Sequence, residues 1–186
     1  MTRVRYVRTP NDYPGTPDEA TRHDLKELFE QLYPGSDHPR IDDAHSGFAI
    51  TAQSPRLALH ILQLTRYCAR EMQWSKRRDL LELAVQTLNI HFRCESSYEA
   101  HVAYAKASGI SPTLLAALPY WRTTSLFNDE QRLVIEYTEV VTAGEVPQAL
   151  FTRVVERYGE KGAIEFTAAV ALWSFWAMIL NATRCS

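Results

Sequence analysis

The sequence predicts an all-α fold, and two features of its 186 residues carry that prediction. Residues typical of helix starts and stops recur along the whole chain, with Ser, Asn or Asp ahead of the apolar runs and Gly or Pro behind them. Between these signals, apolar side chains recur at intervals of three and four residues, as in Leu25, Leu28, Phe29 and Leu32. No segment shows the strict alternation typical of a β-strand. We therefore expect more than half of the residues to be helical.

These signals place the helices in chain order. Thr16-Pro17-Asp18-Glu19 resembles a capping box that begins the first helix, and Pro34-Gly35 ends it. Residues 34–53 are rich in Pro, Gly, Asp and Ser and are expected to form a loop. Short connections between the helices favour a helical bundle in a single domain, residues 1–186. Further helices are expected to begin at Pro55 and then to span about 76–91, 94–108, 112–118, 129–143, 147–159 and 161–182.

Composition and charge argue against several classes of protein. With 46% hydrophobic and 23% charged residues, the chain resembles an ordinary soluble protein with a packed core. The net charge of −2 makes nucleic acid a poor partner. No apolar region follows the arginines of the first ten residues, so we do not expect a secretory signal. The three cysteines, Cys68, Cys94 and Cys185, do not suit a disulfide scaffold, which favours a cytoplasmic location.

Residues 166–183 carry no charge and are nearly long enough to cross a bilayer. Polar side chains at Thr167, Ser174 and Asn181 interrupt this run, and no cluster of Lys or Arg marks one end as cytoplasmic. A helix that is apolar on all sides can also lie in a core or between subunits. We expect that arrangement here, with no membrane partner.

One segment combines a thiol, a hydroxyl and an imidazole at helical spacing. Cys94, Ser97 and His101 lie in one predicted helix, and at about 100° per residue they share a narrow face. A thiol becomes a good nucleophile where a base or the N-terminus of a helix favours the thiolate. Cys94 and His101 are therefore candidate catalytic residues, with Ser97 as a relay between them. The structural alternatives are that Cys94 is a small buried side chain and that Ser97 caps the helix.

Glu82 adds a carboxylate to these candidates. It lies twelve residues before the cysteine in an apolar helix, where a buried carboxylate needs a partner. A break near residues 92–93 would fold the two helices together and bring Glu82 to His101, as an orienting acid or as a base. His91, Glu95 and His101 do not have the spacing of a standard zinc site, so neither a metal nor a cofactor is expected.

These residues resemble the core motif of alkylhydroperoxidase AhpD-like proteins, Glu-x11-Cys-x2-Cys-x3-His followed by a glycine eight residues later. In this sequence the positions are Glu82, Cys94, Ser97, His101 and Gly109. The segment CESSYEAH is also similar to that of carboxymuconolactone decarboxylases. The resemblance covers about residues 55–145 and leaves an N-terminal helical extension of about residues 1–50. It implies an AhpD-like helical bundle, a small-molecule substrate and a homo-oligomer, either a trimer or a hexamer.

One departure from the motif bears on the reaction. Peroxidases of this family carry thiols at both cysteine positions, and the second thiol attacks the hydroperoxide while the first resolves it. Ser97 stands at the second position and forms neither a sulfenic acid nor a disulfide. The resemblance therefore implies either proton transfer or decarboxylation on a small lactone or organic acid, or an antioxidant, peroxiredoxin-type reaction at the single thiol of Cys94. A catalytically silent ligand-binding or assembly protein on the same fold is the remaining alternative.

Overall fold

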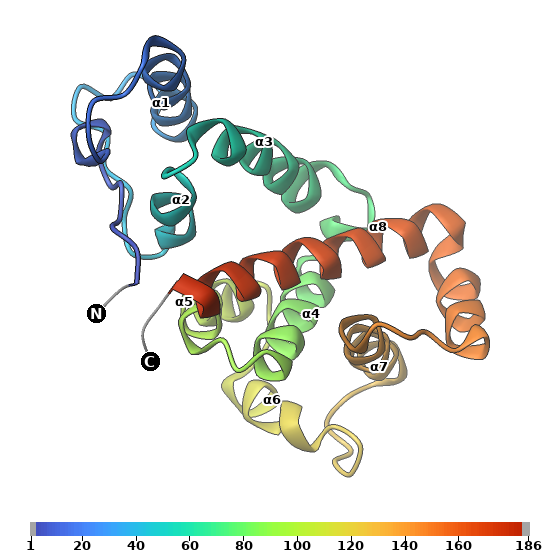
Figure 1. Ribbon diagram of the computed structural model, residues 1–186. Coiled ribbons are helices and arrows are strands. Elements are labelled where there is room, and N and C mark those ends of the chain that lie inside the picture. The colour runs from blue at the N-terminus through green and yellow to red at the C-terminus, as the bar shows by residue number, and fades with distance from the viewer. Residues whose placement is uncertain (1–2, 184–186) are drawn as a thin grey trace. The chain divides into compact units, whose positions relative to one another are not determined.

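The computed structural model describes residues 3–183, and helices make up 72% of the structure. The described residues form helices and connecting loops without a strand, which confirms the all-α prediction (Figure 1). Contacts within the chain divide it into two compact units. One unit contains the chain up to Arg66 together with the residues from Asn181 onward, and the other is Tyr67–Leu180. The single-domain organisation stays a prediction.

The first unit is built on packed helices from the N-terminal third of the chain. In order they are η1 (Pro10–Asp12), α1 (Glu19–Leu32), α2 (Ser46–Thr51) and α3 (Pro55–Arg66). Both α1 and α2 pack against α3. The segment that precedes η1 is held in this unit by a backbone hydrogen bond of 2.9 Å, in which Val7 N–H donates to the carbonyl of Ala49.

Two details of this unit differ from the prediction. The cap of α1 is Asp18 rather than Thr16, because the Asp18 carboxylate accepts the backbone N–H of Thr21 at 2.8 Å. That hydrogen bond holds the pKa of the Asp18 carboxyl below its ordinary value. The second difference is α2, which forms where a loop was expected and buries Phe48. Packing stabilises this short helix, since an isolated helix of its length is unstable in water.

The second unit is centred on α4. Its elements are η2 (Tyr67–Glu71, a π-helical turn), η3 (Trp74–Lys76), α4 (Arg78–His91), α5 (Glu95–Ala107), α6 (Pro112–Ala117), η4 (Leu118–Tyr120), α7 (Asp129–Ala143) and α8 (Gln148–Thr183), the last up to Leu180. Figure 1 shows α4 between α5 and α7, and it packs against both. Every residue from Leu80 to Asn89 is buried, which explains why α4 is apolar over most of its surface.

The helix ends of this unit follow the predicted signals. Asn128 and Gln131 form the capping box that begins α7, and Gly144 ends α7 in the left-handed conformation with a φ of 91°. The hydroxyl of Ser111 caps α6. Gly159, with a φ of 72°, kinks α8 at the boundary predicted between two separate helices. Local sequence chemistry therefore decides where these helices begin, end or bend.

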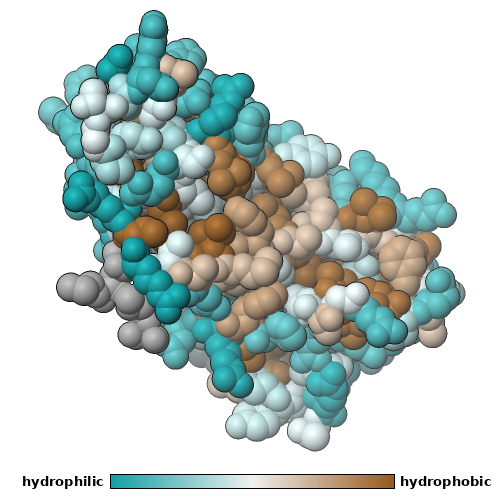
Figure 2. All heavy atoms as spheres, viewed as in Figure 1, coloured by the Kyte–Doolittle hydropathy of each residue, from teal (hydrophilic) through white to brown (hydrophobic). Residues whose placement is uncertain are grey.

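In the second half of the long helix α8, from Phe166 to Met178, both the buried face and the exposed face are largely apolar. On the buried face, Phe166 stacks on Trp74 with ring centroids 4.0 Å apart. Among the described residues, α8 is the one helix long and apolar enough to cross a membrane, and 61% of its apolar window is buried within the structure, as in a core helix. Figure 2 shows apolar side chains gathered along the course of α8. Its exposed apolar side chains include Ile164, Ala168, Ala171 and Met178.

Candidate active site

The hairpin of α4 and α5 brings together two of the predicted site residues, Glu82 and His101. Oε2 of Glu82 lies 2.8 Å from Nδ1 of His101. Glu82 is buried, and the His101 side chain is 19% exposed, so the imidazole reaches both the carboxylate and solvent. The break predicted near residues 92–93 separates α4 from α5 and lets the two helices pack together. The sequence-based expectation that Glu82 folds back to His101 thus agrees with the observed geometry.

The tautomer of His101 decides which atom of this pair donates the hydrogen bond. In the tautomer with its proton on Nδ1, the imidazole donates to the Glu82 carboxylate, and Nε2 carries the lone pair and is the basic atom. The guanidinium of Arg78 lies 4.0 Å from the second carboxylate oxygen of Glu82. The rings of Tyr104 and Trp173 lie 5.6 Å and 6.5 Å from the imidazole centroid, which gives His101 an aromatic surrounding.

The turn between α4 and α5 is a Schellman motif with an unusual residue at its left-handed position. Cys94 N–H donates to the carbonyl of Asn89, and Arg93 N–H donates to the carbonyl of Ile90, at 2.8 Å and 3.1 Å. Arg93 has a φ of 52°, the positive φ that glycine usually supplies at this position of a helix end. No other described residue except glycine has a positive φ. The chain therefore holds an arginine in a strained conformation directly before Cys94.

Cys94 is the residue that precedes the first turn of α5. Its side chain is buried, and Sγ lies 3.8 Å from the hydroxyl of Ser96. The backbone N–H groups at this end of a helix favour a negative charge, including that of a thiolate. Cys94 also lines a pocket of about 470 Å³. The pocket is lined by Asn89, Ile90, Arg93, Cys94, Glu95, Tyr98, Glu99, Leu115, Ala116 and Pro119.

The predicted group of four residues does not converge on this pocket. Cys94 lines it, whereas Glu82, Ser97 and His101 are absent from its lining. Around the axis of α5, the pocket residues Tyr98 and Glu95 lie on one side of Cys94, and Ser97 and His101 lie on the other, at about 100° per residue. Two helical turns, roughly 10 Å along the axis, also separate Cys94 from His101. Cys94 and His101 therefore lie on adjoining faces of α5, and His101 contacts Glu82 of α4.

Ser97 lies on the same side of α5 as His101 and is buried, with 6% of its surface exposed. It does not cap α5, because the residue at the cap position is Cys94. Its place one turn after Cys94 on the helix is the place that the second thiol of the resembled motif would occupy. The structure therefore keeps a small buried hydroxyl where the dithiol proteins carry sulfur.

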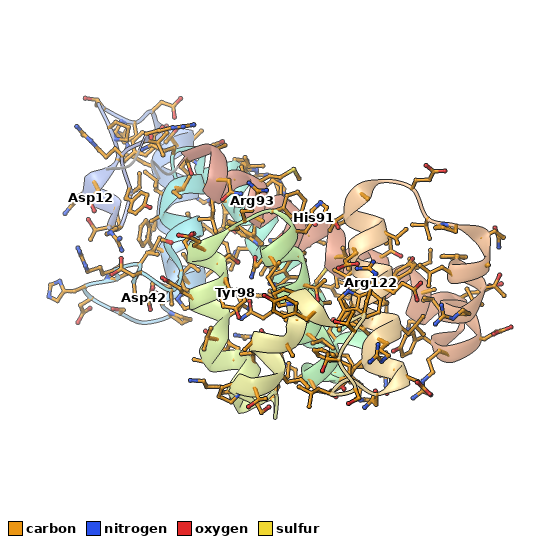
Figure 3. All side chains as sticks on the ribbon, turned by 90° about the horizontal axis from the view of Figure 1, so that it is seen from below. Asp12, Asp42, His91, Arg93, Tyr98 and Arg122 are labelled. Carbon is orange, nitrogen blue, oxygen red and sulfur yellow. The ribbon has the colours of Figure 1, made fainter. Side chains whose placement is uncertain are left out.

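Sequence reasoning missed two polar residues beside this site. Gln86 is fully buried and donates from Nε2 to the carbonyl of Tyr98 at 3.1 Å, while Asn89 donates to Oε1 of Gln86 at 3.3 Å. Oδ1 of Asn89 is buried without a hydrogen-bond partner. Arg93, which the sequence also offered as a partner for Glu82, lies in the pocket wall instead. Figure 3 shows Arg93 at the junction of α4 and α5, with Tyr98 farther along α5. The signal that could have found Gln86 and Asn89 is their polarity within a wholly buried stretch of helix.

The remaining candidates from the sequence lie apart from this arrangement. Among residues 3–183, no three His, Cys, Asp or Glu side chains form a group that could hold a metal ion. Cys68 is buried and does not line the pocket beside Cys94, and burial raises the pKa of its thiol. Cys185 lies outside the described residues.

Comparison with known proteins relates this geometry to a fold. No protein-family model matches the sequence. The uncharacterized protein YnjA of Escherichia coli (strain K12) is 38% identical over 80 residues, which are 42% of this chain and 43% of that protein. The match therefore spans less than half the length of the curated relative.

A solved structure gives a longer match. It is a protein of unknown function from Agrobacterium tumefaciens, which its description relates to the antioxidant defence protein AhpD. The TM-score is 0.63 at 18% sequence identity, over 73% of this chain and 93% of that one. At 18% sequence identity, the similarity between the two structures shows a shared fold and nothing about function. The chain accordingly has an AhpD-like, all-helical fold.

Proposed function

We propose that this protein is a small-molecule enzyme of the carboxymuconolactone decarboxylase-like type, in which Glu82 and His101 move a proton on a small lactone or organic acid. The observation that carries the proposal is the 2.8 Å contact between Oε2 of Glu82 and Nδ1 of His101. A carboxylate in this position orients the imidazole and stabilises its protonated form, as general acid–base chemistry requires.

The proposed reaction uses Nε2 of His101 as the proton-carrying atom. As a base, Nε2 takes a proton from the carbon beside a carbonyl group of the substrate, and Glu82 stabilises the imidazolium that forms. In a decarboxylation, the bond to the departing CO₂ breaks, its electron pair moves onto that carbon and into the adjacent carbonyl group, and the imidazolium supplies the proton. Burial of Glu82 strengthens its interaction with the imidazolium, since the local dielectric is low.

Proton exchange on a panel of small acids tests this proposal. The purified protein is incubated in heavy water with carboxylated lactones and 3-oxo acids, while NMR follows deuterium uptake and a separate assay follows CO₂ release. We expect the wild type to exchange or decarboxylate at least one compound. His101→Asn and Glu82→Gln should lower that rate by about 10²- to 10⁴-fold, the usual contribution of a general acid or base.

Two matched variants control this experiment. His91→Asn changes an exposed histidine in the last turn of α4, and Cys94→Ser removes the thiol. Both variants should retain the wild-type rate of proton transfer. If the His101 and Glu82 variants react as fast as the wild type, the pair is not the catalytic base and the proposal is wrong.

A single-thiol peroxidase is the second candidate, favoured by the position of Cys94. The thiol lies at the N-terminal end of α5 and in the wall of a pocket of about 470 Å³. The Agrobacterium tumefaciens neighbour is described in relation to antioxidant defence, which agrees with this chemistry. In the proposed step the thiolate attacks one oxygen of a hydroperoxide, an S–O bond forms, the O–O bond breaks and the alcohol leaves. An external dithiol then attacks the sulfenic acid, which releases water and forms a mixed disulfide, and its second thiol group displaces the Cys94 thiolate as the dithiol closes to its own disulfide.

Consumption of tert-butyl hydroperoxide in the presence of dithiothreitol separates the two candidates. A peroxidase loses this activity in Cys94→Ser and keeps it in Cys68→Ser, whereas an acid–base enzyme shows no peroxide consumption above the background. If neither peroxide nor any acid of the panel is turned over, a catalytically silent ligand-binding or assembly protein becomes the better account of this fold.

A further inference from the structure

Arg93 has a strained backbone conformation. Such strain lowers the stability of the fold unless contacts of the side chain offset it. Its φ of 52° lies in the left-handed region, where residues with a Cβ are strained and glycine is not. The other helix ends with positive φ, at Gly109 and Gly144, carry glycine. Strained residues of this kind gather at ligand sites, because the strain is kept where the side chain is used.

The guanidinium of Arg93 has no ion pair or hydrogen bond with any residue of the described chain. Arg77, by comparison, pairs with both Asp79 and Glu130. Arg93 is exposed and lines the pocket beside Cys94, so its positive charge is available to a ligand. Contacts within the chain therefore do not explain why an arginine stands at this turn.

The other residues of the pocket lining indicate which chemical groups such a ligand would carry. Its wall includes the apolar side chains of Ile90, Leu115 and Pro119, which suit a short apolar body. Oδ1 of Asn89, buried and without a partner, is an acceptor that lacks a donor. Since buried acceptors in proteins are usually paired, this atom would accept a hydrogen bond from an O–H or N–H group of a ligand in the pocket.

We propose that Arg93 anchors the anionic group of the ligand in this pocket, and that the ligand is a small carboxylate with an apolar body and an O–H donor. The inference rests on the second candidate function, which places Cys94 and its pocket in the functional site. Glu95 and Glu99 also line the pocket, and both are exposed. Their negative charges oppose a carboxylate, so Arg93, the one cationic side chain of the pocket lining, is the group that would hold it.

Alkylation of Cys94 by two matched reagents tests the anchor. Iodoacetate and iodoacetamide both react by attack of the thiolate sulfur on the CH₂ carbon, with formation of a C–S bond and loss of iodide. They are nearly equal in size, but only iodoacetate carries a carboxylate. The measured quantity is the ratio of the two rate constants at Cys94, followed by peptide mass spectrometry of the folded protein.

We expect Arg93→Gln to lower the ratio of the iodoacetate rate to the iodoacetamide rate by about fivefold or more, as the loss of a nearby partly solvated charge implies. Arg93→Lys should keep most of the wild-type ratio. Arg70→Gln removes an exposed arginine that does not line the pocket, and it should leave the ratio unchanged.

Three results would overturn the proposal. The ratio could stay the same in Arg93→Gln, it could fall equally in Arg70→Gln, or neither reagent could reach Cys94 in the folded wild type. Because alkylation needs no turnover, the ratio also separates this inference from the proposed function. If the ratio depends on Arg93 but the protein shows no enzymatic activity, the anion-binding role of Arg93 is supported and the proposed enzymatic function is wrong.

Discussion

Nδ1 of His101 lies 2.8 Å from Oε2 of Glu82, across the hairpin that α4 and α5 form. Because the carboxylate is buried and the imidazole is partly exposed, the pair can hold a proton internally and exchange it with a ligand or with solvent. Cys94 lies two turns earlier on α5 and faces a separate pocket. The candidate site thus consists of an acid–base pair and a thiol that adjoin each other without direct contact.

Removing the strained side chain at Arg93 should stabilise the protein. Glycine adopts a φ of 52° without steric conflict, so Arg93→Gly is expected to raise the free energy of unfolding by about 1 kcal/mol. Urea unfolding followed by circular dichroism measures the change. Gly109→Ala is the opposite substitution, at a φ of 94° with no atom near the added Cβ, and it should destabilise by a similar amount. A lower stability for Arg93→Gly would show that the arginine makes stabilising contacts.

Among the two described thiols, Cys94 should react faster with iodoacetamide than Cys68. Burial raises the pKa of the Cys68 thiol, so less of it is thiolate near pH 8 than in an ordinary cysteine. Cys94 lines a pocket through which a reagent approaches the sulfur, whereas Cys68 does not line that pocket. Alkylation at several pH values, with each site quantified by peptide mass spectrometry, measures the difference. Cys68 rates equal to those of Cys94 across this range would contradict it.

Ser97→Cys should create a thiol pair that the natural sequence lacks. Residues three apart on a helix have Cα atoms within disulfide reach, roughly 5 to 6 Å. One equivalent of peroxide should then oxidise Cys94 and the new thiol to a disulfide, with the peroxide reduced to alcohol and water. Intact mass after alkylation detects the loss of two reactive thiols, and peroxidase turnover with dithiothreitol should rise. In the wild type, the same treatment should form no disulfide within α5. If both thiols of the variant stay alkylatable, the site has diverged from the geometry of the dithiol proteins.

The exposed apolar face of α8 leads us to expect a homo-oligomer. Met178 is 52% exposed on that face, and a buried contact between subunits would remove such side chains from water. Light scattering should give a trimer or hexamer for the wild type and a smaller mass for Met178→Asp. Leu126→Asp is the matched control, since Leu126 is 51% exposed but lies in the loop before α7. A monomeric wild type at micromolar concentration, or one that needs detergent to stay in solution, would refute this expectation.

The features that the sequence predicted are the ones that local chemistry decides. The capping box at Asn128 and the glycine stop at Gly144 act on neighbouring backbone groups, so they place helix ends without knowledge of the fold. The same holds for the hairpin that joins Glu82 to His101, because the break and the apolar faces on either side of it are visible in the sequence. By contrast, α2 is a short helix that follows a polar stretch, and its stability comes from packing against α3.

The features that the sequence did not predict depend on three-dimensional packing. The left-handed φ of Arg93 could not be foreseen, since arginine has no preference for that conformation and only the finished turn imposes it. The unpaired Oδ1 of Asn89 likewise depends on which groups surround it after folding. Helical spacing predicted that Cys94, Ser97 and His101 share one face, but it could not show that the pocket includes Cys94 without Ser97 and His101.

The protonation state of His101 tests the central claim most directly. The imidazole nitrogen chemical shifts of isotope-labelled protein distinguish the tautomer with its proton on Nδ1 from the more common one with its proton on Nε2. If the Glu82 carboxylate holds the imidazole, the neutral form of His101 should carry its proton on Nδ1, and Glu82→Leu should abolish that preference while His91 stays unchanged. A neutral His101 with its proton on Nε2 in the wild type would contradict the account, because the basic nitrogen would then face the carboxylate and could not serve a substrate.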